Sequence, residues 1–216
     1  MVAGQTGQIG IIRRARESNT AQRIRYSEVR QELRAHLCDL GRSGRGLAAI
    51  RSRFEQMADD ASLDNWTRED ARLSVDVIDG FAGMANKIAG GRFEPAPRQQ
   101  PMLKLSGVDV SVYLDVMMTR TRGTKDEIGG VLFRLTKADD GETATAKREE
   151  MGLYAATLAL MQVQANLSNG RTPHHQLCAA FDIQAGDVHY APRTFVRRAQ
   201  DMENACRFIA AMWHSA

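Results

Sequence analysis

Acidic and basic side chains in two strand-like segments are the residues of this sequence best placed to do chemistry. Asp115 stands in "VYLDVMM", and Lys137 ends "RLTK". Carboxylate oxygens are the ligands that a hard cation such as Mg²⁺ prefers. Asp109 and Asp115 differ by an even number of positions, so both would lie on one face of a continuous strand. Asp109 and Asp115 are therefore candidate metal ligands, and Mg²⁺ is the cofactor expected if the protein is catalytically active.

A second group of metal-binding residue types lies in "TPHHQLC", residues 172–178. Adjacent side chains on an extended chain point to opposite sides, so His174 and His175 are not expected to bind one ion together. No CxxC pair accompanies them, which disfavours a structural zinc site. Cys206 falls at helical spacing from Met202, which predicts a thiol in the apolar core.

The elements that must position these residues fall into four predicted parts. Residues 1–22 lack hydrophobic periodicity and are predicted to form a flexible basic arm. Residues 23–93 are predicted to be helical. Residues 94–101, "EPAPRQQP", hold three of the five prolines of the chain and are predicted to be a linker. Residues 102–216 then form a mixed α/β core domain.

Within the helical part, the sequence predicts three helices. Apolar residues recur at helical spacing over 26–40 and over 47–57. A third helix is expected to begin near Thr67, whose hydroxyl can cap it, with Asp70 at the capping-box position.

In the core domain the apolar period changes. Residues 103–118 alternate polar and apolar side chains and are predicted to form one strand region, and residues 128–137 form a second. The glycines at 129–130 suggest a bulge or a close backbone approach.

Two helices and a hairpin complete the core domain. A long helix is expected from about 145 to 167, a hairpin turning at 185–186, and a closing amphipathic helix after it. The predicted class is therefore α+β: a helical N-terminal part followed by a mixed sheet flanked by helices.

Charge is distributed unevenly along the chain. Residues 1–53 contain eleven arginines, no lysine and four acidic residues. Guanidinium groups grip phosphate through two hydrogen bonds, so this region is a candidate nucleic-acid contact. An arginine-rich solvated face is the alternative interpretation. The candidate nucleic-acid-binding residues are Arg13, Arg14, Arg16, Arg23, Arg25, Arg197 and Arg198.

The order of elements resembles the PD-(D/E)XK restriction-endonuclease-like fold, whose core is a helix, three strands, a helix and a strand. The resemblance implies that Asp115 corresponds to a metal-binding aspartate and Lys137 to the lysine that positions or deprotonates the attacking water. The second acid would stand two residues before Lys137, where this chain has Leu135. Leucine cannot bind a cation, so the catalytic motif is incomplete.

The helix after the second strand region adds to the resemblance. RecB-like exonucleases carry Q-x-x-x-Y on this helix, and "EMGLYAATLAL" places Glu150 and Tyr154 at that spacing, one helical turn apart. The resemblance therefore implies a site of Asp115, Lys137, Glu150 and Tyr154, in which Glu150 could replace the missing acid.

Three functions stay open on the sequence. The first is a nucleic-acid-associated protein with a degenerate nuclease-like core. By resemblance, such a protein would be an accessory unit of a mobile element or a defence complex. The second is an active metal-dependent nuclease. The third is an assembly module that binds a protein partner or itself, for which exposed apolar stripes on the first two helices would be expected.

Compartment and membrane association can also be predicted. No apolar run approaches the roughly 18 residues of a membrane span, and no signal peptide is recognised. The three cysteines are far apart, which fits a reducing cytoplasm. The expectation is a cytoplasmic protein without a membrane partner.

Overall fold

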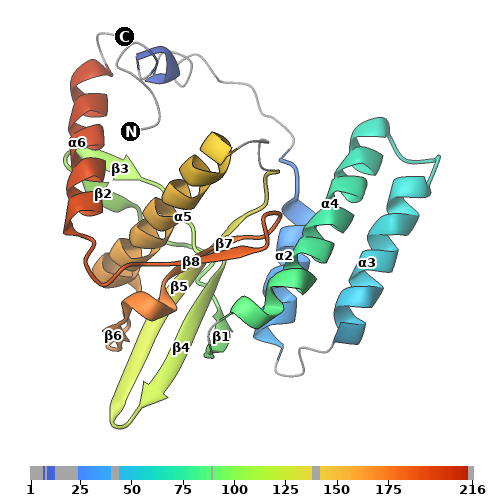
Figure 1. The fold of residues 1–216 in the computed structure, drawn as a ribbon, viewed down its shortest axis with the longest axis horizontal. Helices are drawn as coiled ribbons and strands as arrows, with labels where there is room; N and C mark the ends of the chain where they lie inside the picture. The colour runs from blue at the N-terminus through green and yellow to red at the C-terminus, as the bar shows by residue number, and fades with distance from the viewer. Residues whose placement is uncertain are drawn as a thin grey trace.

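The chain folds into a mixed β-sheet with helices on both faces (Figure 1). This computed structural model describes residues 7, 9–12, 24–39, 44–88, 90–137 and 142–213. Its longer helices are α2 (Ser27–Cys38), α3 (Gly44–Asp59), α4 (Asn65–Met84), α5 (Glu142–Gln162) and α6 (Val196–Met212). The expected α+β class is confirmed, as are the helices expected in these regions.

The main sheet has the strand order β1-β4-β5-β7-β8, with β6 beside β5. The strands are β1 (Arg92–Pro95), β4 (Val116–Arg122), β5 (Lys125–Arg134), β6 (Thr172–Pro173), β7 (Ala179–Asp182) and β8 (Asp187–Tyr190). β1, β4 and β5 are antiparallel, and α5 then carries the chain to β7, which runs parallel to β5. β8 returns antiparallel to β7, through the hairpin that the sequence predicts.

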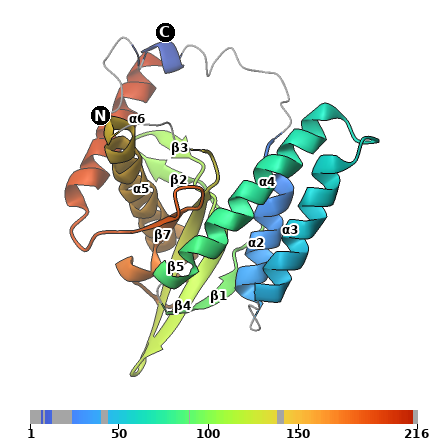
Figure 2. The same cartoon turned by 45° about the vertical axis from the view of Figure 1, so that its right-hand side comes forward.

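α2 and α4 lie on one face of the sheet, and α3 packs against these two helices on their outer side (Figure 2). The apolar stripe of α2, formed by Val29, Leu33 and Leu37, is completely or almost completely buried. It belongs to the same core as Phe133 and Phe181, whose rings stack with centroids 6.0 Å apart. The stripe of α2 is therefore buried inside the molecule, and it does not supply the exposed apolar surface that would support the assembly hypothesis.

The start of α4 differs from the expected cap. Asp64, not Thr67, is the N-cap residue, and its carboxylate accepts a hydrogen bond of 3.0 Å from the Thr67 N–H. A carboxylate three residues upstream reaches this otherwise unpaired amide, so the helix begins at Asn65. Asp70 instead accepts a hydrogen bond from the Tyr26 N–H, which ties α4 to the start of α2.

The opposite face of the sheet is covered by α5, with α6 and a small two-stranded sheet beyond it. Leu160 and Val163 are buried in this second core. Cys206 lies in the same core, which confirms the expected core thiol. At its C-terminal end α5 widens into a π-helical turn, Val163–Leu167.

The region 103–118, expected to be one strand, is divided into three. β2 (Leu103–Leu105) and β3 (Val108–Val110) pair with each other as a hairpin outside the main sheet. Ser106 and Gly107 both have positive φ, 46° and 86°, which is the geometry of a two-residue hairpin turn. Within this region only β4 (Val116–Arg122) belongs to the main sheet, where it lies between β1 and β5.

The glycines of β5 mark close packing, as the sequence suggests. A Cβ on Gly129 would lie 2.1 Å from the carbonyl oxygen of Leu177, and one on Gly130 would lie 2.3 Å from a methyl group of Leu114. The Leu177 carbonyl is part of the backbone, so position 129 requires glycine, whereas the Leu114 methyl group at position 130 is the movable end of a side chain.

The proline-rich segment 94–101 begins inside the sheet, because Glu94 and Pro95 belong to β1 and pair with Met117 and Val116. The helices before this segment share one core with the strands after it. No helix in the described part of the chain is both long enough and apolar enough to cross a membrane.

Candidate functional site

Asp115, the first candidate catalytic acid, is completely buried and bound to an arginine of α2. Both of its carboxylate oxygens accept hydrogen bonds from Arg30 Nη1, at 2.9 and 2.8 Å. Oδ2 also accepts the Phe133 N–H at 2.7 Å, and Arg30 Nη2 donates to the Phe133 carbonyl at 3.1 Å. The Asp115–Arg30 pair thus hydrogen-bonds both the N–H and the carbonyl of Phe133 on β5. These two groups would otherwise pair with the backbone of a longer β4.

A second arginine of α2 strengthens this junction. Arg34 Nε donates to the backbone carbonyl of Asp115 at 2.9 Å. Burial raises the pKa of the Asp115 carboxyl, while the positive charge of Arg30 and the Phe133 N–H act in the opposite direction. In this arrangement Asp115 joins α2 to two strands, and its oxygens are already occupied by donors.

Lys137, the candidate catalytic lysine, is exposed just beyond the end of β5, and Leu135 on the same segment is buried in the core of the α2–α4 face. The backbone carbonyl of Leu135 accepts a hydrogen bond of 2.7 Å from the side-chain amide of Gln184. Leu135 is therefore a core residue, and the position of the missing acid faces helices rather than solvent.

A separate polar cluster lies at the carboxyl ends of the parallel strands β5 and β7. Asp182 is completely buried, and its Oδ2 lies 2.9 Å from Arg134 Nη1. Arg148 of α5 pairs with the other oxygen of Asp182 and donates to the Thr136 carbonyl at 2.6 Å. Sequence reasoning missed this cluster, because its members lie on three elements far apart in the chain.

Tyr154 contacts α6. The Tyr154 hydroxyl donates to Asp201 Oδ2 at 2.9 Å, and the guanidinium of Arg198 lies 5.6 Å from the centre of the Tyr154 ring. Burial, followed by the hydrogen bond and charge of Asp201, raises the pKa of the Tyr154 phenol. Glu150 is exposed. The tyrosine thus helps to attach α6 to α5.

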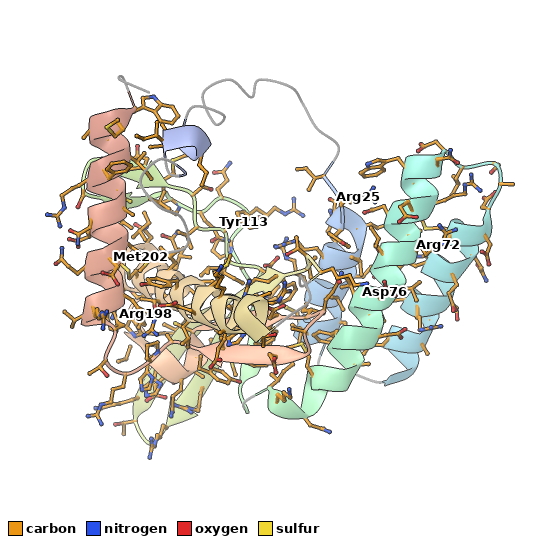
Figure 3. The ribbon with its side chains drawn as sticks, turned by 45° about the horizontal axis from the view of Figure 1, so that its top comes forward. Arg25, Arg72, Asp76, Tyr113, Arg198 and Met202 are labelled. Carbon is orange, nitrogen blue, oxygen red and sulfur yellow. The ribbon has the colours of Figure 1, made fainter. Side chains whose placement is uncertain are left out.

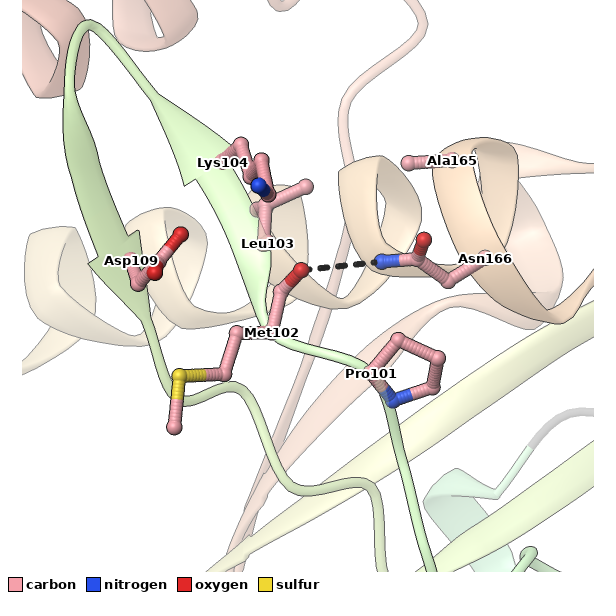
Figure 4. A pocket seen from close by; sticks show the side chains of 7 residues that line it. All are labelled: Pro101, Met102, Leu103, Lys104, Asp109, Ala165 and Asn166. Atoms are coloured by element: carbon pink, nitrogen blue, oxygen red, sulfur yellow. Dashed lines mark hydrogen bonds between the residues drawn. The ribbon is translucent and has the colours of Figure 1, made fainter.

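Asp109 does not share a strand with Asp115, so the expected pairing of these two acids on one strand face is wrong. It lies on β3, exposed, at an open pocket of about 480 Å³ (Figure 4). Lys104 of β2 is its cross-strand partner. Asn166 lines the same pocket and donates to the Met102 carbonyl at 3.5 Å.

The rings of His174 and His175 stack with centroids 4.9 Å apart, so the expectation that they point to opposite sides is wrong, although their Nδ1 atoms contact different groups. His175 Nδ1 lies 3.0 Å from the Ala191 carbonyl, and His174 Nδ1 accepts the Gln176 N–H at 3.2 Å. Cys178 is completely buried, which raises the pKa of its thiol to about 12. Among the described residues, no group of three or more His, Cys, Asp and Glu side chains is arranged to hold a metal ion.

The candidate phosphate-binding arginines are only partly within the described residues. Arg13, Arg14, Arg16 and Arg23 lie outside them. Arg25 is exposed and its guanidinium lies 5.5 Å from the centre of the Trp66 ring. Arg25 and Arg198 lie on opposite sides of the molecule (Figure 3), so they do not form one surface. Arg197, beside Arg198 on α6, is exposed.

Sequence reasoning also missed a set of basic residues, Arg120, Arg122 and Lys125, on the hairpin of β4 and β5. Arg120 is opposite Glu127, and Arg122 is opposite Lys125. The available signal was the alternation in "TRTRGTK", which lies between the two predicted strand regions. Period-2 alternation of arginines is instead what one charged face of a strand produces.

Comparison of the chain with protein-family models, with curated proteins and with solved structures gives no match.

Proposed function

We propose that this protein binds nucleic acid through a nuclease-like scaffold and does not cleave it. In this proposal the core is a degenerate relative of the PD-(D/E)XK restriction-endonuclease-like fold. The protein would serve as an accessory unit of a mobile element or a defence complex, located in the cytoplasm.

The order of elements supports the scaffold part of the proposal. Helices precede three antiparallel strands, β1, β4 and β5, and α5 then leads to the parallel strand β7. Apart from the β2–β3 hairpin, which stands between β1 and β4, this order agrees with the helix, three strands, helix and strand that the resemblance implies. α5 crosses one face of the sheet while α2–α4 cover the other.

The observation that carries the proposal is the ion pair between Asp115 and Arg30. The acid that the resemblance assigns to the metal is fully buried, and its two oxygens accept three hydrogen bonds from protein donors. A catalytic cation would have to displace Arg30 and leave its charge uncompensated. The other assigned groups, Lys137, Glu150 and Tyr154, do not converge on Asp115, which supports binding without cleavage.

The nucleic-acid part of the proposal is supported by charge. The N-terminal quarter of the sequence is rich in arginine and free of lysine, and guanidinium groups suit phosphate recognition. Binding of this kind depends steeply on salt, because each neutralised phosphate releases condensed counterions.

The test combines cleavage and binding in the same samples. Labelled single- and double-stranded DNA and RNA are incubated with the full chain and Mg²⁺ or Mn²⁺, at two salt concentrations, beside Lys137→Ala and Glu150→Gln. We expect salt-sensitive binding and intact substrate with all three proteins. Metal-dependent cleavage that is lost in the two variants would establish an active nuclease instead.

A further inference from the structure

We propose that the hairpin of β4 and β5 is the surface that contacts nucleic acid, and that its occupant is the phosphate backbone of duplex DNA. This inference rests on the proposed function and names the site through which it acts. The hairpin includes the turn between Arg122 and Lys125 and extends beyond the helices that cover the sheet (Figure 1, Figure 2).

One face of the hairpin carries three cationic side chains. Strand alternation and the pairing of β4 with β5 place Arg120, Arg122 and Lys125 on the same face. Nearer the sheet, this is the face that α2–α4 cover. Arg122 and Lys125 are exposed, and neither forms an ion pair with a residue that the structure describes. Their charges are therefore available to a partner.

The one carboxylate on this face is withdrawn from solvent. Glu127 is 8% exposed, and its Oε2 accepts hydrogen bonds from Arg120 Nε at 2.9 Å and Nη2 at 2.6 Å. Arg120 stays 28% exposed and is held in a fixed orientation. Glu127 thus orients one cation while presenting little negative surface, and the face keeps a positive balance.

The reverse face of the hairpin is chemically different. Thr121 and Asp126 are cross-strand partners there, and the threonine hydroxyl donates to the Asp126 carboxylate at 2.8 Å. The hairpin therefore has a cationic side and a neutral to acidic side. Such asymmetry matches a partner that approaches from one direction with negative charge.

The shape of the hairpin favours duplex DNA over duplex RNA as the partner. The turn is tight, with Gly123 at φ 62°, so the two strands stay paired up to Arg122 and Lys125. A two-stranded ribbon fits the major groove of B-form DNA, roughly 12 Å wide. The deep, narrow major groove of an RNA duplex does not admit it. The basic side chains would lie along the groove wall and contact phosphates.

The test compares two charge-matched double variants of the full chain. Arg122→Gln with Lys125→Gln removes two cations from the hairpin. Arg98→Gln with Lys104→Gln removes two exposed cations from the segment around β2, outside the main sheet. The probe is a labelled DNA duplex, titrated from low to moderate salt. We expect the hairpin variant to bind more weakly, with a log–log salt slope shallower by about 2, and the control variant to match the wild type.

A footprint gives an independent readout. Acylation of lysines with and without the duplex should protect Lys125, while Lys87, Lys104 and Lys147 keep their reactivity. Wild-type binding by the hairpin variant, an equal loss in both variants, unprotected Lys125, or a preference for duplex RNA would each overturn the inference while leaving the proposed function standing. Absence of nucleic-acid binding by the wild type would instead overturn the proposed function, and this inference with it.

Discussion

Asp115 and Asp182 are fully buried carboxylates, and each is held by arginine side chains rather than by a solvent-filled site. A buried charge is tolerated only when it is paired and hydrogen-bonded, because transfer from water costs several kcal/mol per ion. These buried ion pairs therefore join elements of the fold. Asp115 fixes α2 to the sheet, and Asp182 fixes α5 to β5 and β7.

The first prediction concerns this role of Asp115. Asp115→Asn leaves Arg30 without its counter-charge while keeping the side-chain shape. We expect the free energy of unfolding to fall by about 3 kcal/mol, at the lower end for a buried pair because Arg30 is partly exposed. Urea unfolding measures this loss. An unchanged midpoint would contradict a structural role, and Asp201→Asn, at an exposed pair with Tyr154, is a suitable control.

The second prediction concerns pH. Burial lowers the pKa of His189 below its usual value near 6.5. The negative charge of Asp182 raises this pKa and the positive charge of Arg134 lowers it, but burial has the largest effect. The unfolded chain therefore binds this proton more readily than the folded chain. The stability that depends on neutral His189 is complete above about pH 6.5 and is lost as the pH falls below it.

Urea midpoints measured between pH 5.5 and 7.5 test this dependence. The ring of His189 packs against Gly152, where a Cβ would lie 2.2 Å from it, so His189→Phe keeps an aromatic ring in place and removes the titration. We expect a shallower decline with acid for this variant. The same decline in both proteins would show that His189 does not contribute.

At the scale of the element, close backbone contacts fix how α4 lies on the sheet. Gly80 faces the turn after β7, and a Cβ there would be 2.4 Å from the carbonyl oxygen of Ile183. Gly83, one turn further along the same helix, has nothing within 4 Å of such an atom. The two glycines therefore serve as a matched pair.

The third prediction follows from this difference. Gly80→Ala should lower the free energy of unfolding by about 1–3 kcal/mol, because backbone atoms must move apart. Gly83→Ala should raise it by about 0.5–1 kcal/mol, since alanine is the better helix former and open space receives it. Thermal or urea unfolding measures both. Stabilisation by both substitutions would mean that α4 is not held against the turn as described.

The helices of this chain could be predicted from the sequence more reliably than its strands. Hydrophobic periodicity gave the helices correctly, because their stripes are long and face a core. The single strand expected over 103–118 failed at Ser106 and Gly107, whose turn signal lies inside an apparently continuous alternation. β1 was hidden by the prolines around it, since an edge position tolerates them.

The candidate site was less predictable than the fold, for a physical reason. Asp115 was singled out by its place near a strand, but the partner that determines its role, Arg30, is 85 positions away. Asp182, Arg134 and Arg148 likewise meet only through the packing of α5 on the sheet. Residue types and spacing identify side chains that could take part in a reaction. Whether such a side chain is already held in an ion pair depends on residues far away in the sequence.

At the scale of the whole molecule, the sheet separates two hydrophobic cores and projects one hairpin beyond its helical covers (Figure 1). The core ties the candidate catalytic acid into the fold, while the projecting hairpin leaves cations exposed. This arrangement predicts that the protein binds nucleic acid mainly through electrostatic attraction. It also predicts that added Mg²⁺ weakens binding as a competing counterion and does not activate a reaction.

The affinity of the full chain for a DNA duplex as a function of salt tests the proposed nucleic-acid binding most directly. We predict a straight line of log affinity against log salt with a slope of about −3 or steeper, since three or more phosphates would be neutralised at roughly 0.9 per contact. The duplex should remain intact throughout. Binding that is absent, or that does not change with salt, would contradict the account.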